Sequence, residues 1–523
     1  MSSISKKTKK QIEKIEAMPV AKRPIFHKNH RPIMTRRDLI SRGFVSFTSS
    51  VMVPGVLASL SQRAYGIECV SKKDGGTPIP FMVMDLGGGA NFAMGNVIAG
   101  KKGGQKDFLD DAAAAMLGCP SDQNPKNNPA MAVPINDNAD GNGLLFHANS
   151  GFLAGFRAVT SQTTRANVDG MLFCGRSGDD TRNNPLNPVY WIQSAGATGQ
   201  LVDVVGAGDG TARGRSQAPA DSITAASSAR VTNAVDAVSL IDTGLIGQIL
   251  PNQADKIMKA AQNLSASQLM AFNKKSVSEQ VATLVQCGYI KATENLTKFT
   301  PNAVRPDNDP MIAQALAINN INANPNINNA FTLPNNNNEQ DQVTTLAKLV
   351  IDGYAGSATM TMGGYDYHGQ GRRTQTIKDF NAGVHAGRAF ELAALKGSPL
   401  MMAFITDGGV SARTDVDNSP EAAGRFSFRS DSGTRSSAFM LCFNPEGLIS
   451  TGVRQVGAFL DGSGAVDLEA SAVGDSPINL TKAIALNYMA LSGTEADFAK
   501  VVQTNPFSDV AKVIGFKSIK KQG

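Results

Sequence analysis

Cysteine, histidine and tryptophan are scarce in this chain of 523 residues, and their scarcity removes whole classes of protein. The five cysteines, from Cys69 to Cys442, lie far apart and form no Cys-x-x-Cys pair. This excludes a small zinc knuckle, an iron–sulfur cluster and a dense disulfide scaffold, and the odd number leaves at least one thiol unpaired. There are five histidines, and none follows His385. Any metal site must therefore depend mainly on carboxylates.

Long apolar runs are also missing. A bilayer span needs about 20 mostly apolar residues, and no stretch of this sequence meets that requirement. The apolar stretch at 45–60 is diluted by serine, threonine, proline and glycine. It follows MTRRDLI, which contains Arg36 and Arg37 behind a hydroxyl residue, and small residues follow it in AYG at 64–66. This order predicts a signal peptide over 34–66 that the twin-arginine translocase reads, and a periplasmic, secreted or cell-surface mature protein. The alternative is a solvated basic tail.

Positive charge is concentrated at the N-terminus. The first 66 residues hold thirteen lysines and arginines against three acids, a net charge of +10, whereas the whole chain carries +6. Residues 67–523 therefore carry a net charge of −4, and no basic patch indicates a nucleic-acid partner. We predict that residues 1–33 form a disordered basic extension.

Short apolar runs that alternate with helical patterns predict an α/β fold. The first run, PFMVMDL at 80–86, ends in three glycines and is typical of a buried parallel strand. Further strands are predicted at 168–174, 201–206, 357–364, 399–409, 437–443 and 454–460, and helices at 152–161, 188–195, 342–354 and 376–397.

Residues 230–340 interrupt this alternation. Four stretches between 230 and 325 carry apolar residues at helical spacing, and an asparagine-rich tract covers 319–338. Asparagine competes with regular backbone hydrogen bonding and favours turns. We predict a mostly helical insertion, ending in a surface loop, within one domain over 67–523.

Carboxylates and one imidazole directly follow the predicted strands. Asp85 ends the first strand, and Asp407 ends the strand at 399–406, where the turn of the 399–409 segment begins. Asp366 and His368 follow the strand at 357–364, in GGYDYHGQGR. Parallel α/β sheets bind ligands beyond the carboxyl ends of their strands, and these groups are ordinary ligands of zinc, manganese or iron. These four residues are the candidate metal ligands, although a single aspartate there also suits a helix cap or an Asx turn.

Other polar residues offer fewer indications of a site. Ser177 and Thr181 lie in the polar loop at 175–188, before a predicted helix, and either offers a hydroxyl nucleophile near an anion-binding helix end. Alternatively, this is a hydrogen-bonded loop that caps the helix. His147 and His385 are predicted to serve in capping or packing.

Four features together resemble the exported, sulfatase-like proteins of domain-of-unknown-function family 1501, within the alkaline-phosphatase superfamily. They are the leader before FMVMDLGGGAN, the segment LLFHANSGF with its helix and strand, GGYDYH after a strand, and PLMMAFITDGG. The resemblance covers most of residues 67–523. It implies an alkaline-phosphatase-like α/β/α sandwich, with a divalent metal (zinc, manganese or calcium) at Asp85, Asp366, His368 and Asp407 beside a hydroxyl nucleophile.

The chain departs from that family's pattern in two places. ITDGG at 405–409 stands where the family usually has Ser-Glu-Phe-Gly-Arg, and Ser430, Asp431 and Ser432 stand where it usually has an Asp-His pair. Three hypotheses about function remain open. The chain is an exported metal-dependent hydrolase of sulfate or phosphate esters, a non-catalytic periplasmic or cell-surface protein that binds a protein partner or serves in assembly, or a redox or cofactor enzyme. The sequence has no dinucleotide-binding motif that would support the last hypothesis.

Overall fold

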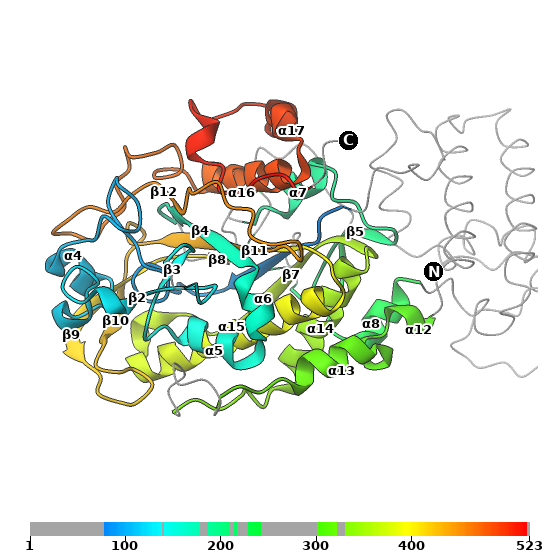
Figure 1. Ribbon diagram of the computed structural model, residues 1–523, viewed down its shortest axis with the longest axis horizontal. Helices are drawn as coiled ribbons and strands as arrows, with labels where there is room; N and C mark the ends of the chain where they lie inside the picture. The colour runs from blue at the N-terminus through cyan, green and yellow to red at the C-terminus, as the bar shows by residue number, and fades with distance from the viewer. Residues whose placement is uncertain are drawn as a thin grey trace, which may run out of the picture. The chain divides into compact units, whose positions relative to one another are not determined.

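An eight-stranded sheet lies at the centre of the part of the chain that the structure describes (Figure 1). The computed structural model describes residues 78–138, 141–177, 187–208, 228–241, 301–321 and 330–519, with three single positions at 214, 216 and 219. The strands of this sheet are β1 (Phe81–Leu86), β4 (Val168–Cys174), β5 (Val202–Gly206), β6 (Ser228–Arg230), β7 (Ala355–Met362), β8 (Leu400–Thr406), β11 (Ser437–Phe443) and β12 (Gln455–Val456). Their spatial order is β12-β4-β11-β8-β1-β7-β5-β6.

Strand direction decides which residues meet at each edge of the sheet. β1 pairs in parallel with β7 and β8, and β5 pairs in parallel with β6 and β7. β11 runs antiparallel to both β8 and β4. The residues just before β11 therefore lie at the same edge as the carboxyl ends of β1, β4, β7 and β8.

β1 is central because it is apolar on both of its faces. Met82 and Met84 pack into one hydrophobic cluster, and Phe81 and Val83 pack into the other on the opposite face. Each such side chain contributes about 1.5–3 kcal/mol when it is fully buried. The strand predicted at 80–86 is confirmed.

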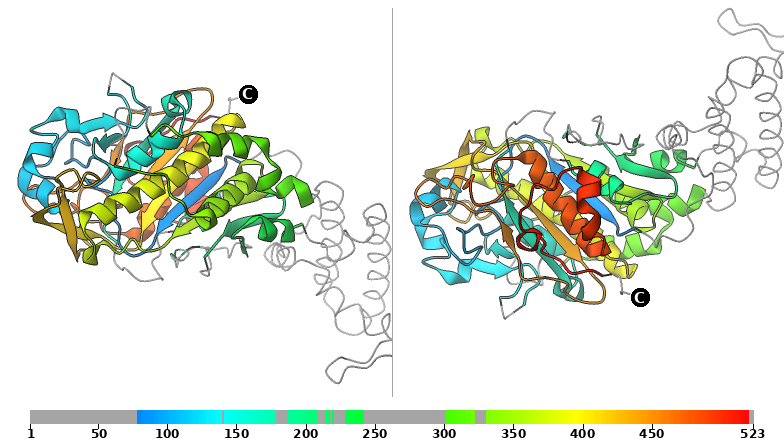
Figure 2. Two further views of the ribbon diagram at one scale, coloured as in Figure 1. Left: turned by 90° about the horizontal axis from the view of Figure 1, so that it is seen from below. Right: turned by 90° about the horizontal axis from the view of Figure 1, so that it is seen from above.

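Helices cover both faces of the sheet, as the two views of Figure 2 show. The helices that cover one face include α5 (Gly151–Val159), α14 (Asn337–Ile351) and α15 (Arg372–Leu395), and those on the other include α7 (Val189–Ser194) and α16 (Pro477–Ser492). The predicted α/β fold, with helices on both sides of a largely parallel sheet, is confirmed.

α5 and α15 pack unusually closely because glycines line their contact. A Cβ atom built on Gly155 would lie 2.0 Å from the carbonyl oxygen of Phe380, and one on Gly383 would lie 2.0 Å from that of Phe152. Only glycine allows two helix backbones to approach this closely. The contact holds α15 in place, and the segment that carries Asp366 and His368 leads directly into its first turn.

Several predicted boundaries differ from those of the structure. The helix predicted from 342 begins at Asn337, because the Asn336 side chain accepts a hydrogen bond from the Glu339 amide and caps it. The strand predicted at 454–460 was too long, since only the two residues of β12 pair with β4. The helix α16 was missed, because residues 480–491 are all buried and show no polar face.

A second, two-stranded sheet was also missed. It consists of β9 (Val410–Val416) and β10 (Phe426–Asp431), which pair antiparallel directly after β8. Polar residues alternate only partly along these strands, and β-bulges interrupt their register. This small sheet delivers Asp431 to the edge of the main sheet.

The remaining elements are short. They are α4 (Asp111–Met116), β2 (Ala132–Pro134), β3 (Leu145–His147), α6 (Gln162–Ala166), α8 (Ala234–Ser239), α12 (Pro301–Val304), α13 (Pro310–Ala317) and α17 (Phe498–Val502). Of these, α8, α12 and α13 fall within the predicted insertion, whose central part at 242–300 lies outside the described residues. Ile312 and Ala315 of α13 join the same hydrophobic cluster as α14 and α15.

Three of the five cysteines fall within the described part of the chain. Cys119, Cys174 and Cys442 are buried, and each is a free thiol. Burial raises the pKa of the Cys119 thiol to about 12 and that of Cys174 well above its usual value. Among the helices that the structure describes, none is both long and apolar enough to cross a membrane. The predicted basic extension and signal peptide lie outside the described residues.

Candidate metal centre

The turn after β1 and the loop after β7 touch at the carboxyl edge of the sheet. The Gly87 amide donates to the Met362 carbonyl, and the Tyr365 amide donates to the Gly87 carbonyl, each at 3.1 Å. Gly88 has a φ of +123°, and a Cβ atom on it would lie 2.6 Å from the Asp366 amide nitrogen. Both the backbone conformation and the close contact require glycine there. The glycines after β1 thus let Asp366 lie against the central strand.

Asp366, His368 and Asp431 form a cluster at this edge. One ligand atom from each lies within 4.8 Å of the others. The His368 Nδ1 atom is 3.1 Å from an Asp431 carboxylate oxygen and also contacts the Asp366 carboxylate. The three side chains are about half exposed, at 43%, 52% and 56% for His368, Asp366 and Asp431. A ligand from solvent can therefore reach them.

Two different segments supply the cluster. Asp366 and His368 come from the loop after β7, where His368 lies in a single helical turn at Tyr367–Gly369. Asp431 ends β10, and the Ser432 amide that follows donates to the Gly409 carbonyl beyond β8 at 2.8 Å. The cluster therefore depends on how the loop after β7 is held against β10.

The Gln375 side chain joins these two segments. It is fully buried in the first part of α15. Its amide nitrogen lies within hydrogen-bond distance of the Tyr367 carbonyl at 2.8 Å and the Phe428 carbonyl at 3.1 Å, and its oxygen accepts from the Phe428 amide at 3.3 Å. The Tyr367 and Phe428 rings also stack, with centroids 6.3 Å apart. One glutamine thus links the neighbour of His368 to the strand that ends in Asp431.

Tyr367 is also held in place by a buried carboxyl group, that of Asp379. Its hydroxyl donates to Asp379 Oδ1 at 2.6 Å. Burial raises the pKa of Asp379 to about 6, although the nearby Arg372 guanidinium opposes this. Burial lowers the pKa of Arg372, whose guanidinium lies 4.7 Å from the centroid of the Phe428 ring. The ring and hydroxyl of Tyr367 are therefore both fixed, and His368 follows directly at the surface.

Asp85 and Asp407 lie at the same edge, but they are buried and stand outside this cluster. The Ser216 amide and hydroxyl both donate to Asp85 Oδ2 at 2.9 Å. The Gly88 amide donates to Asp407 Oδ1. Both carboxylates are 1% exposed or less. The structure thus brings together two of the four candidate ligands, Asp366 and His368, and gives the other two hydrogen-bonding partners within the protein.

The candidate nucleophiles are placed only in part. Ser177 is buried just beyond β4, and its carbonyl oxygen would lie 2.8 Å from a Cβ atom on Gly433, two residues after Asp431. Thr181 lies outside the described residues, as do Arg36 and Arg37 of the predicted signal. A catalytic role for Ser177 or Thr181 stays a prediction.

The other two described histidines are buried away from solvent. Burial lowers the pKa of His147 to about 3, and its Nε2 atom is 3.7 Å from the Cys119 sulfur. His385 Nε2 is 3.3 Å from a Glu339 carboxylate oxygen, and burial lowers its pKa. Both serve the packing of the core.

Asp431 is the cluster member that the sequence analysis did not select. It was noticed only as the position where the resembling family has an Asp-His pair. The signal that points to it is its place just before β11, because a reversed strand starts at the edge where its neighbours end. The sequence pattern at 437–443 predicts the strand but gives no direction for it.

Comparison with known proteins leaves the family of this chain open. No family model matches the sequence, and no curated protein matches it. A solved structure of TAB5 alkaline phosphatase, a point mutant with magnesium bound in its M3 site, is 10% identical and covers 82% of this chain and 100% of that one. The TM-score is 0.21, so this likeness carries no argument about activity.

Proposed function

We propose that this protein is an exported hydrolase of phosphate or sulfate esters that holds one divalent metal ion at Asp366, His368 and Asp431. The observation that carries the proposal is the half-exposed cluster of two carboxylates and one imidazole. It lies at the sheet edge where α/β proteins bind ligands. The proposal that the protein is exported depends on Arg36 and Arg37 in the sequence.

The cluster suits a divalent ion in composition and in size. Oxygen and nitrogen ligands lie about 2.0–2.2 Å from zinc, so two ligands of one ion are separated by at most about twice that distance. The ligand atoms of the cluster lie within 4.8 Å of one another, so small side-chain rotations suffice. Two carboxylates also balance the charge of a divalent ion, and an imidazole nitrogen as the third ligand favours manganese or zinc over calcium.

Three protein ligands are typical of catalytic metal sites that keep a position open for water or substrate. A bound divalent ion supplies a Lewis acid that polarises an ester and lowers the pKa of bound water. Asp366, His368 and Asp431 would bind the ion, while Gln375 and Tyr367 hold those ligands in position. Ser177 is the proposed hydroxyl nucleophile, and its backbone carbonyl lies against Gly433, two residues after Asp431.

One observation favours the alternative, a non-catalytic binding or assembly protein. Asp85 and Asp407 accept hydrogen bonds from the protein itself, so these two strand-end carboxylates serve its internal structure. A fold in which such groups have structural partners retains less capacity for a second metal ion. The two hypotheses differ in whether the remaining cluster binds metal and turns over an ester.

Metal content measured by mass spectrometry tests the proposal. Wild-type protein is equilibrated with zinc, manganese or calcium, dialysed and compared with Asp366→Ala/His368→Ala and with Asp431→Ala. Asp415→Ala, which removes an exposed aspartate of β9 outside the cluster, is the matched control. We expect stoichiometric metal in the wild type and the control, and its loss in both cluster variants.

Hydrolysis of p-nitrophenyl phosphate and p-nitrophenyl sulfate completes the test. We expect turnover of at least one ester that a chelator abolishes and added metal restores. A folded wild type that binds no metal contradicts the proposal. Stoichiometric metal without turnover of either ester supports the binding alternative.

A further inference from the structure

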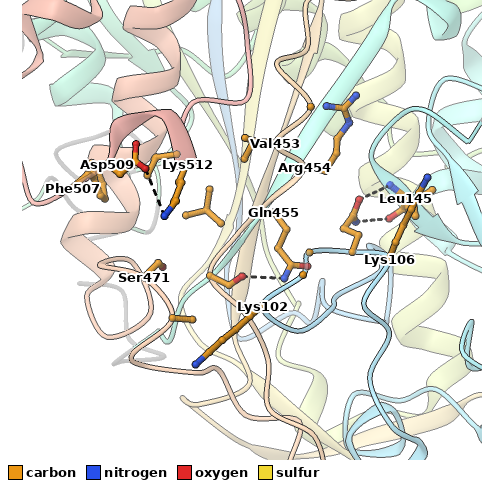
Figure 3. Close-up of a pocket in the computed structure, with 18 of the residues that line it drawn as sticks. Lys102, Lys106, Leu145, Val453, Arg454, Gln455, Ser471, Phe507, Asp509 and Lys512 are labelled. Carbon is orange, nitrogen blue, oxygen red and sulfur yellow. Dashed lines mark hydrogen bonds and ion pairs between the residues drawn. The ribbon is translucent and has the colours of Figure 1, made fainter.

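A groove with a volume of about 830 Å³ opens beside β12. Separate segments at 102–106, 141–145, 452–457, 470–472 and 506–513 contribute its lining, and none of them contains a residue of the metal cluster. Figure 3 shows these segments meeting around Gln455. A volume of this size falls within the range of about 300–1,000 Å³ that is usual for small-molecule sites.

Positive charge predominates around the groove. Lys102, Lys106, Arg454 and Lys512 line it, against the single acid Asp509. Residues 67–523 carry a net charge of −4, so this concentration of cations is opposite in sign to the rest of that region. In Figure 3, Lys102 and Lys512 lie to one side of the groove's centre, and Arg454 and Lys106 lie to the other. A clustered positive potential of this kind attracts anions.

The three lysines are open to a ligand. Lys106 is exposed and makes no ion pair with any residue that the structure describes. Lys512 is 83% exposed and lies 3.6 Å from Asp509, and Lys102 is 72% exposed and lies 3.2 Å from Asp467. Both partners of the Lys512–Asp509 pair are exposed, and exposed ion pairs contribute little, so an anionic ligand displaces this pair at low cost.

The floor of the groove, in contrast, is fixed. The Arg454 guanidinium lies 2.7 Å from Asp169, whose side chain is 1% exposed. The Gln455 amide group accepts from the Gly100 amide and donates to the Gly100 carbonyl, each at 2.9 Å. Phe507 is the aromatic residue of the lining, and it is only 7% exposed. A rigid polar floor beneath flexible cations suits a ligand that is polar and carries several negative charges.

We propose that this lysine-rimmed groove binds an organic polyanion, a ligand of about the size of one or two sugar rings that carries several phosphate or sulfate groups. Lys102, Lys106 and Lys512 bind the anionic groups, and the floor at Arg454 and Gln455 contacts the scaffold. Charge-assisted hydrogen bonds from ammonium groups are the strong contacts of such a site. The groove does not depend on the metal centre, and its ligand need not be a substrate.

Calorimetric titration of the full chain with two named ligands tests this proposal. Inositol hexakisphosphate represents the phosphorylated class and sucrose octasulfate the sulfated class, with uncharged inositol as the blank. We expect saturable binding of at least one polyanion, weakened by added salt, and none of inositol. The preferred polyanion identifies the class of anionic group.

Variants locate the binding to the groove. We expect Lys106→Gln/Lys512→Gln to weaken binding by about 100-fold, because each of the two lost charged hydrogen bonds contributes about a factor of ten. Lys500→Gln/Lys517→Gln removes two lysines that do not line the groove and should leave binding unchanged. Asp366→Ala/His368→Ala should also bind normally, which separates this site from the metal centre.

Three results would overturn the proposal. They are the absence of saturable binding by both polyanions, equal binding by wild type and Lys106→Gln/Lys512→Gln, and equal weakening by the control pair. Lys106 and Lys512 are both exposed, so Lys106→Gln/Lys512→Gln should keep the thermal unfolding midpoint of the wild type.

Discussion

Replacing Gln375 with methionine should loosen the metal centre without touching a metal ligand. Methionine has a similar volume and fills the buried site, but it cannot hydrogen-bond the backbone of both segments. The Tyr367 carbonyl and the Phe428 amide and carbonyl would each lose a buried partner. The loop that carries His368 would then no longer be tied to the strand that ends in Asp431.

The magnitude follows from the hydrogen bonds that are lost. The amide nitrogen of Gln375 has two protons for three carbonyl acceptors at 2.8–3.1 Å, those of Tyr367, Gln370 and Phe428, and its oxygen accepts one further bond. At about 1 kcal/mol for each bond, the free energy of unfolding should fall by about 3 kcal/mol. Residues that support metal ligands typically change metal affinity by about 10–100-fold, and we expect a loss in that range.

Urea denaturation and metal titration measure the two effects separately. Gln200→Met, which replaces an exposed glutamine, is the control for the methionine side chain. Metal is titrated in the absence of urea, at a temperature where both variants are fully folded. The reasoning fails if Gln375→Met is destabilised as expected but binds metal as tightly as the wild type. If the wild type binds no metal, the metal proposal itself fails, and the prediction for Gln375 then concerns only the free energy of unfolding.

Two further predictions concern stability. The folded-state pKa of Asp379, about 6, lies above the unfolded value of 3.8, so its contribution is fully present below pH 3.8 and is lost as the pH rises through 6. Stability should fall by about 3 kcal/mol between pH 3 and 7 because of this carboxyl group, and Asp379→Asn should flatten that decline in denaturation curves, whereas an unchanged slope would refute the pKa shift. Gly155→Ala places a Cβ atom 2.0 Å from the Phe380 carbonyl oxygen and should cost about 3 kcal/mol in urea denaturation. Gly369→Ala, where nothing lies within 4 Å, should change stability by less than about 0.5 kcal/mol.

The strands of the main sheet could largely be predicted from sequence, because each buried strand is a short apolar run. β1, β4 and β11 appear in the structure at or within one residue of their predicted bounds. α16 could not be found in this way, since it is buried all round and has no amphipathic period. The β9–β10 pair is polar and bulged, so its pattern resembles a loop.

The candidate site could be predicted only by half, for a topological reason. Asp366 and His368 lie two positions apart in a single loop, so one motif identifies both. Asp431 joins them because β11 is antiparallel, and strand direction follows from long-range pairing that no local pattern records. Asp85 and Asp407 accept hydrogen bonds from Ser216 and Gly88, respectively, and each donor is distant in sequence from its aspartate.

The central position of β1 has a consequence for how the chain is made. Phe81 pairs with Ser357 and with Met401, so the first strand of the sheet must wait for about 320 further residues before both of its neighbours exist. At synthesis rates of about 5–20 residues per second, that wait lasts roughly 15–60 s. Until β7 has been synthesised this largely apolar strand has neither of its partners, and such late long-range pairing is slow and prone to aggregation. The nascent chain should therefore depend on a holding chaperone until β8 has been synthesised.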